Sequence, residues 1–129
     1  MNTQLSAEEV QRYSRHLVLK EFGMENQVKL RNAKVLVVGA GGLGCPALLY
    51  LAAAGVGTLG IIDSDKVEVS NLQRQVLYNV SDIGKNKAEA AQQHLALLNP
   101  LITFRSMAAR LTVQNALQII REYDVGVDG

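Results

Sequence analysis

The stretch "AKVLVVGAGGLG", residues 33–44, decides how this chain folds. Its first half is an unbroken apolar, β-branched run, which is typical of a strand buried on both faces of a parallel sheet. Glycines follow at positions 39, 41 and 44, and a stretch rich in alanine and leucine comes next. In the order strand, glycine turn, helix, backbone N–H groups at the helix N-terminus can face a phosphate. The stretch therefore predicts the first strand–loop–helix unit of an α/β fold.

Strand-like and helix-like segments alternate along the rest of the chain. Each helix-like segment carries apolar residues at helical spacing, with Val113, Leu117 and Ile120 expected to face inward in the last one. This alternation predicts an α/β fold, a Rossmann-like, doubly wound and mostly parallel sheet. The expected elements are a buried helix at 45–55, a strand at 58–63, a helix from Lys85 to Asn99, a strand at 102–106, a helix capped by Thr112 and a strand at 124–129.

The N-terminus carries a separate helical pattern. Ser6 and Glu9 have the spacing of a capping box, and Val10, Tyr13 and Leu17 recur at helical spacing after it. We expect one amphipathic helix over about residues 6–23, ahead of a Rossmann-like part at 33–129. At 129 residues the chain is long enough for one domain and too short for two ordinary cores.

Composition narrows the classes of function. Apolar residues make up 48% and charged residues 19%, as in globular domains, and the formal net charge of +1 offers no broad basic surface for nucleic acid or for a membrane. The single cysteine, Cys45, excludes an internal disulfide and a cysteine-rich zinc cluster, and its apolar neighbours indicate a packed core residue. No apolar leader or membrane-length segment is visible, so a cytoplasmic location is expected.

The glycine turn is expected to bind a nucleotide. Gly39, Gly41 and Gly44 match G-x-G-x-x-G in the required context, and the alternative is a tight turn that needs glycine only for close packing. Asp63 ends the second strand about 20 residues later, where an acidic side chain accepts hydrogen bonds from ribose hydroxyls. These residues alone are also compatible with NAD.

The long polar segment at 64–84 and the helix after it need their own explanation, because long loops at strand ends usually hold a site. Lys85 and Lys87 fall in or near the first turn of a helix, where the macrodipole disfavours each cation by roughly 0.3–1 kcal/mol. An anionic ligand at that end would explain Lys87, with a solvated lysine as the alternative. Arg74 has the same two interpretations: it contacts a phosphate, or it belongs to a solvated loop.

Three blocks carry a family resemblance: "RYSRHLVLKEFG" (12–23), residues 39–78, and "IGKNKAEAA" (83–91). Together they resemble the ubiquitin-activating-enzyme-like adenylyltransferases of the MoeB and ThiF type, over nearly the whole chain. The resemblance implies ATP-dependent activation of the C-terminal carboxylate of a ubiquitin-like sulfur-carrier protein, in a molybdopterin or thiamin type pathway, with ATP and magnesium as cofactors. The implied nucleotide-binding residues are Gly39, Gly41, Gly42, Gly44, Asp63, Asp65, Asn71, Arg74, Gln75 and Lys87.

The resemblance also implies catalytic roles for Arg74 and Lys87 on the phosphates, together with Arg15. Arg15 resembles an arginine that members of this family reach across a dimer interface to the partner's ATP, which would make the protein a homodimer. Without the resemblance, Arg15 reads as part of the polar face of the first helix.

The sequence also departs from the family. The magnesium-binding aspartate, the carrier-binding region and the zinc ligands of the family would lie beyond Gly129, so no metal-ligating residue is expected within this chain. Two other functions stay open: an NAD-binding oxidoreductase domain, and a non-catalytic interaction module.

Overall fold

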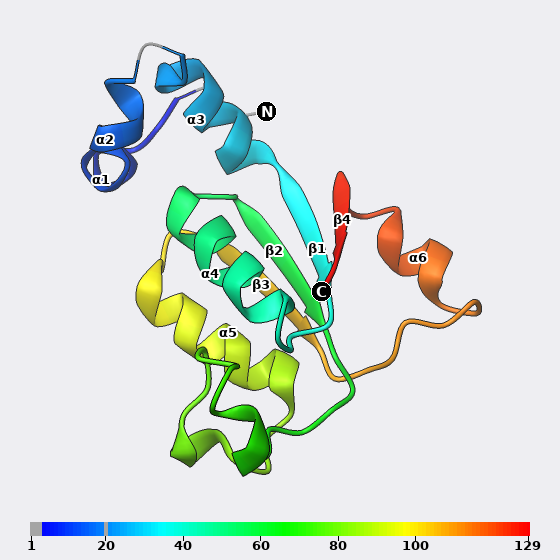
Figure 1. The fold of residues 1–129 in the computed structure, drawn as a ribbon. Helices are drawn as coiled ribbons and strands as arrows, with labels where there is room; N and C mark the ends of the chain where they lie inside the picture. The colour runs from blue at the N-terminus through cyan, green and yellow to red at the C-terminus, as the bar shows by residue number, and fades with distance from the viewer. Residues whose placement is uncertain (1–3, 20) are drawn as a thin grey trace.

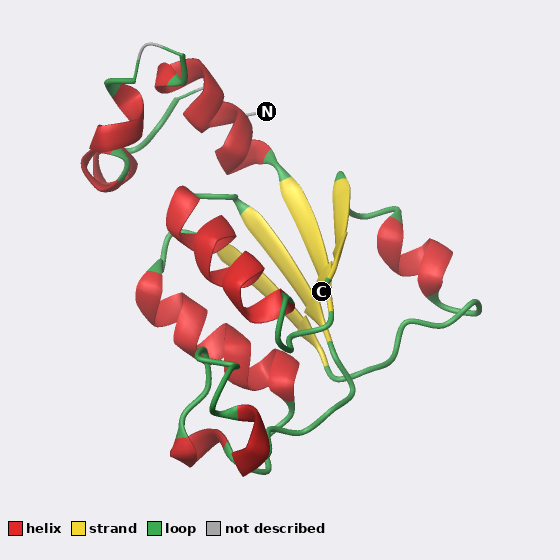
Figure 2. Cartoon of the chain, in the orientation of Figure 1, coloured by secondary structure: helices red, strands yellow, loops and turns green. Residues whose placement is uncertain are grey.

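The structure is a computed structural model and describes residues 4–19 and 21–129. It is a parallel sheet with helices packed against it and a cluster of short helices ahead of it (Figures 1 and 2). The strands are β1 (Lys34–Val38), β2 (Thr58–Ile62), β3 (Thr103–Met107) and β4 (Val125–Asp128). The helices are α1 (Ala7–Arg12), α2 (Ser14–Leu17), α3 (Gly23–Asn32), α4 (Gly44–Ala54), α5 (Lys87–Leu98) and α6 (Ala116–Ile120), with single 3-10 turns at Val69–Asn71 and Val80–Asp82.

The sheet has the strand order β3-β2-β1-β4, and all three pairings are parallel. Val35 is opposite Leu59 in β2 and opposite Val125 in β4, so β1 lies in the middle of the sheet. The first four strands of a Rossmann fold have this order. The predicted fold class is therefore confirmed, and the carboxyl ends of all four strands meet at one edge.

The packed core lies between the sheet and the pair α4 and α5, which contact each other and the strands (Figure 1). β1 contributes Val35 and Val37, and β2 contributes Leu59 and Ile61, because alternate residues of a strand face the same side. The residues of this cluster that the helices contribute are Cys45, Leu48, Ala52, Ala88, Ala90, Ala91 and Leu95, all of them inaccessible to solvent.

The single N-terminal helix predicted at 6–23 is wrong, because the segment folds as α1 and α2 with a break at Tyr13, and α3 follows at Gly23–Asn32. The capping box of Ser6 and Glu9 is confirmed. Of the expected apolar face, Tyr13 is buried, Leu17 is half-buried and Val10 is exposed. Lys20, within the predicted helix, lies outside the described residues.

The segment after β3 differs most from expectation. α6 covers only Ala116–Ile120, and Asn115 rather than Thr112 precedes it. Val113, Leu117 and Ile120 are 94%, 78% and 45% exposed, so the prediction that they face inward is wrong. The predicted fourth strand is confirmed as β4. No helix among residues 4–19 and 21–129 is long and apolar enough to cross a bilayer.

Candidate active site

A cavity of about 500 Å³ opens at the carboxyl edge of the sheet, where the loops that follow the strands come together. Parallel sheets bind ligands at this edge. Gly39 and Gly41 come from the glycine loop after β1, and Asp63 and Asp65 come from the end of β2. The complete lining is Val38, Gly39, Gly41, Ile62, Asp63, Ser64, Asp65, Lys87, Ala109, Arg110, Leu111 and Gly129.

The glycine loop folds as its sequence requires. Gly39 has φ +95°, which L side chains rarely adopt, and a Cβ at Gly44 would collide with the carbonyl oxygen of Gly39. Gly41 and Gly42 have open space or only ordinary contact where a side chain would start. Gly39 and Gly44 therefore build the turn, whereas Gly41 and Gly42 leave it open to a ligand.

Consecutive backbone amides of this loop are left without an acceptor. Among the residues that the structure describes, the N–H groups of Gly41, Gly42, Leu43 and Gly44 donate to no protein group. They stand at the N-terminus of α4, an 11-residue helix whose dipole favours an anion there. Free N–H groups at a helix N-terminus can bind an anion such as a phosphate.

Asp63 is fixed in place by the loops on either side of it. Its Oδ2 accepts the N–H of Ala40 at 2.8 Å, and its Oδ1 accepts the N–H of Asp65 at 2.7 Å. Asn86 donates its side-chain N–H to the carbonyl of Asp63 at 2.8 Å. An ionised carboxylate offers about four acceptor sites, so Asp63 keeps capacity for a hydroxyl group of a ligand.

Lys87 is a nearly buried cation at the edge of this cavity. The helix predicted from Lys85 begins at Lys87, after Asn86, which accepts the N–H of Glu89 as the N-cap. Lys87 is only 7% exposed, and within the described chain its ammonium has no hydrogen bond or ion pair. Lys85, by contrast, precedes the helix and lies 4.0 Å from the carboxylate of Asp82.

Lys87 also lines a neighbouring cavity of about 250 Å³, together with Asp65, Lys66, Glu68 and Asn71. Asn71 is buried, and its Oδ1 accepts the N–H of Glu68 at 2.9 Å, which fixes the first turn of the long loop. Lys87 thus connects the glycine-loop cavity to the long polar loop that the sequence singled out.

Gln75 lies beneath the glycine loop, and its amide nitrogen is the nearest group to the open side of Gly41. It is only 3% exposed, and its Oε1 is the one buried side-chain atom without a hydrogen-bond partner in the part of the chain that the structure describes. Leaving such an acceptor unpaired costs about 1–3 kcal/mol, which functional sites tolerate more often than structural ones.

The two predicted catalytic arginines do not line the cavity. Arg74 is exposed, and its guanidinium donates to the carbonyl of Ser70 at 3.2 Å. Arg15 is exposed on α2, in the N-terminal group of helices. Of the predicted site residues, the structure places Gly39, Gly41, Asp63, Asp65 and Lys87 around this cavity and Asn71 in the neighbouring one. Gly42, Gly44, Gln75 and the two arginines line neither cavity.

Sequence reasoning missed the part of the lining that follows β3. Ala109, Arg110 and Leu111 form one wall of the cavity, and Ser64 adds to the loop after β2. Their position after a strand could have indicated them, because a loop that follows a parallel strand lies at the same edge of the sheet as the glycine loop. Leu111 from this loop and Ile62 from the end of β2 make the lining of the cavity partly apolar.

Cys45 and Tyr78 lie buried behind the glycine loop. Burial raises the pKa of the Cys45 thiol above its usual range, although a helix start alone would lower it. Burial also raises the pKa of the Tyr78 hydroxyl, and nearby Cys45 adds to the rise. Both groups stay protonated near neutral pH, and the interpretation of Cys45 as a core residue is confirmed by its burial.

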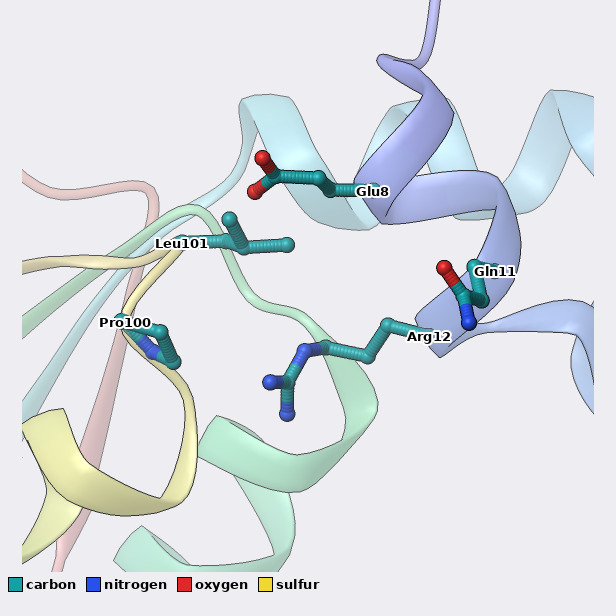
Figure 3. A pocket seen from close by; sticks show the side chains of 5 residues that line it. All are labelled: Glu8, Gln11, Arg12, Pro100 and Leu101. Atoms are coloured by element: carbon teal, nitrogen blue, oxygen red, sulfur yellow. The ribbon is translucent and has the colours of Figure 1, made fainter.

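A second cavity of about 480 Å³ lies far from this chemistry, between α1 and the turn after α5 (Figure 3). Arg12 faces it, but one of its guanidinium nitrogens already donates to the carbonyl of Leu98 at 2.9 Å. None of the predicted site residues lines this cavity, whose full lining is Glu8, Gln11, Arg12, Pro100 and Leu101.

No group of three or more metal-ligating side chains occurs within residues 4–19 and 21–129. Asp63 already accepts two backbone N–H groups, which leaves Asp65 as the other carboxylate in the glycine-loop cavity. The residues present therefore do not build a magnesium site of their own.

Comparisons with known proteins agree with this geometry. The ThiF family matches residues 13–129. The chain is 54% identical over 125 residues to "Probable adenylyltransferase/sulfurtransferase MoeZ" of Mycobacterium tuberculosis, covering 97% of this chain and 32% of that protein. It is 54% identical over 121 residues to "Sulfur carrier protein adenylyltransferase" of Thermus thermophilus, covering 94% of this chain and 45% of that protein.

Solved structures give the same result. The E. coli tRNA N6-threonylcarbamoyladenosine dehydratase TcdA, solved in complex with AMP, has a TM-score of 0.90 and 28% identity, covering 97% of this chain and 50% of that one. E. coli MccB, solved with MccA-N7isoASN, has a TM-score of 0.79 and 36% identity, covering 89% and 34%. The chain thus spans a half or less of each of these four proteins, and it belongs to the ThiF family.

Proposed function

We propose that this chain carries the ATP-binding part of an adenylyltransferase that activates the C-terminal carboxylate of a ubiquitin-like sulfur-carrier protein. The observation that carries the proposal is the row of unpaired amides from Gly41 to Gly44 beside the unpaired ammonium of Lys87. A nearly buried cation without a carboxylate partner is costly unless an anion joins it. A polyphosphate satisfies the amides and the ammonium together.

The reaction suits these groups. An oxygen of the carrier's carboxylate bonds to the α-phosphorus of ATP, and the bond from that phosphorus to the bridging oxygen breaks. Pyrophosphate leaves with the electron pair, and an acyl-adenylate remains. The nucleophile is already ionised at neutral pH, so the site needs positioned donors for the phosphate charge rather than a general base.

We assign roles to the residues that line the cavity and to their neighbours in the glycine loop and the long polar loop. Gly41, Gly42 and Gly44 donate backbone N–H groups to phosphate oxygens, and Lys87 pairs with the phosphate charge. Asn71 and Gln75 supply amide groups beside them. Asp63 and Asp65 accept the ribose hydroxyls, and the partly apolar wall formed by Ile62 and Leu111 accommodates the adenine. Magnesium would enter on the phosphates of ATP, because the described residues form no site for the free ion.

Arg74 and Arg15 do not line the cavity, so each of them needs a different route to the phosphates. Arg74 lies on the exposed long loop, and we propose that it turns to the phosphates when ATP binds. We propose that Arg15 acts across a homodimer interface on the partner's ATP, as the family resemblance implies. Its exposure on α2, away from its own cavity, is compatible with that role.

The names of two similar proteins support a partner for this chain. The Thermus relative is named for a sulfur carrier protein, and MccB was solved with MccA-derived peptides, so both names point to a macromolecular or peptide substrate. We propose a sulfur-carrier partner of the molybdopterin or thiamin type for this chain, and a cytoplasmic location.

The test is calorimetric titration with ATP and magnesium, and separately with NAD. ATP binding should weaken by about 1.5–3 kcal/mol in Lys87→Ala, since a charged hydrogen bond contributes that much. Arg74→Ala should weaken ATP binding by the same range and should leave NAD binding unaffected. The matched control is Lys85→Ala, which removes a nearby cation that lines neither cavity and should change the affinity little. NAD binding without any ATP response would overturn the proposal in favour of an oxidoreductase domain.

A further inference from the structure

The peptide unit between Ala40 and Gly41 is held from behind the glycine loop. The Ala40 carbonyl oxygen accepts the Tyr78 hydroxyl at 2.6 Å and the Cys45 thiol at 3.3 Å. The N–H of Ala40 is held separately by Asp63 at 2.8 Å. Ala40 itself is inaccessible to solvent. Both sides of this residue are therefore fixed by side chains from other parts of the chain.

Fixing the carbonyl also fixes the next N–H. The peptide bond is planar and trans, so the N–H of Gly41 points opposite to the C=O of Ala40. That carbonyl points toward the buried Tyr78 and Cys45, so the Gly41 N–H points away from them. Gly41 lines the nucleotide cavity, and its N–H has no acceptor among the residues described. The direction of a phosphate donor thus depends on what holds the carbonyl behind it.

Tyr78 also reaches the other side of the site. Its hydroxyl lies 3.2 Å from the backbone carbonyl oxygen of Lys87, in the first turn of α5. A phenol has one proton, so the shorter contact, to Ala40, takes most of it and the longer one shares it. One buried oxygen therefore connects the glycine loop to the helix that carries Lys87, although residues 40 and 87 lie far apart in the sequence.

We propose that Tyr78 is a positioning residue for ATP: its hydroxyl aims the Gly41 N–H at the phosphates and fixes the glycine loop relative to Lys87. The ATP part of this inference rests on the proposed function, whereas the positioning of the loop does not. Tyr78 touches no part of the cavity, so it acts through the backbone groups that it holds.

The variant Tyr78→Phe deletes only the hydroxyl. In the nucleotide-free chain, we expect the ¹⁵N order parameter of the Gly41 amide to fall from about 0.85, the rigid value, toward 0.6. We expect the Kd for ATP to rise about three- to tenfold, as the loss of one neutral hydrogen bond predicts. The matched control is Tyr13→Phe, because Tyr13 is also buried and its hydroxyl accepts a bond from Asn99 at 2.8 Å, away from the site. It should change neither readout.

Three outcomes decide the proposal. An unchanged Gly41 order parameter in folded Tyr78→Phe overturns it, and so does an equal change in both readouts for Tyr13→Phe. If Tyr78→Phe does not fold, the wild-type chain decides, since a Gly41 amide already below 0.6 without nucleotide contradicts a held loop. Failure of the wild-type chain to bind ATP would count against the proposed function alone, because the order-parameter measurement needs no nucleotide.

Discussion

The helices α4 and α6 are both apolar in sequence and differ in what covers them. In α4 Cys45, Leu48 and Ala52 are inaccessible to solvent, because the helix packs on β1 and α5. In α6 no residue is buried, and Leu117 is 78% exposed. Helical spacing predicts which residues share a face, but burial requires a second surface for that face to pack on. The α4 region and the α6 region therefore should respond differently to the same kind of substitution.

The largest difference is expected from truncating one leucine in each helix. Leu48→Ala should lower the free energy of unfolding by about 2–5 kcal/mol, because it leaves a cavity in a closed core. Leu117→Ala should change it by less than about 0.5 kcal/mol. Urea denaturation of the two variants measures both values. Equal losses would show that α6 is packed against another surface in solution.

Substitutions at two glycines should also differ in their effect on stability, by a somewhat smaller amount. Gly44→Ala should destabilise the chain by about 1–3 kcal/mol, since its Cβ would meet the backbone carbonyl of Gly39, which cannot move away cheaply. A Cβ at Gly126 in β4 meets nothing within 4 Å, so Gly126→Ala should be neutral or slightly stabilising. Thermal unfolding of both variants is the measurement. A cost at Gly126 as large as that at Gly44 would contradict an open β4.

The residues that precede α5 and α6 give the third pair. Asn86→Ala should cost about 1 kcal/mol, because Asn86 caps α5 and also donates to the carbonyl of Asp63. Asn115 makes no cap bond to α6, and its two hydrogen bonds stay within an exposed loop. We expect Asn115→Ala to cost less than half as much in the same urea assay. The reverse order would mean that the loop before α6 stabilises the fold more than its exposure indicates.

The smallest effect is a pH dependence of the α4 region. Burial raises the pKa of Cys45 in the folded chain above 9.0, its value without burial. The unfolded chain then loses this proton first, so the stabilisation is complete below about pH 9 and decreases as the pH rises further. We expect a loss of about 1 kcal/mol or less between pH 8 and 9.5. In Cys45→Ala this slope should flatten. An unchanged slope in Cys45→Ala would show that another group titrates.

The sequence predicted the parts of the fold that are set by local pattern. The apolar runs at β1 and β2 form strands, and the glycines at 39 and 44 form the turn that their spacing indicates. It gave no prediction for residues 24–32, which form most of α3, because they are mostly polar and carry no clear apolar face. It also predicted one helix where α1 and α2 form, because a repeating pattern does not show a break at Tyr13.

For the site, the sequence indicated several residues that the structure places at the same edge of the sheet, but it did not show how they are arranged. Lys87 lines the glycine-loop cavity and Lys85 does not, because Asn86 caps the helix between them and leaves Lys85 beside Asp82. Arg110 enters the lining only through the parallel sheet topology, which brings the loop after β3 next to the glycine loop. Such relations depend on elements far apart in the chain, and no local window contains them.

The strand order has a consequence for synthesis. β1 pairs with β4, yet Val35 and its partner Val125 are 90 residues apart along the chain, while a ribosome adds only about 5–20 residues each second. For several seconds, therefore, one edge of the central strand has no partner to complete it. An open edge lined by "KVLVV" is a template for pairing with a second nascent chain. Until β4 is synthesised, only another molecule that binds the nascent chain can cover that edge. Aggregation during synthesis should therefore depend on how quickly residues 125–128 follow.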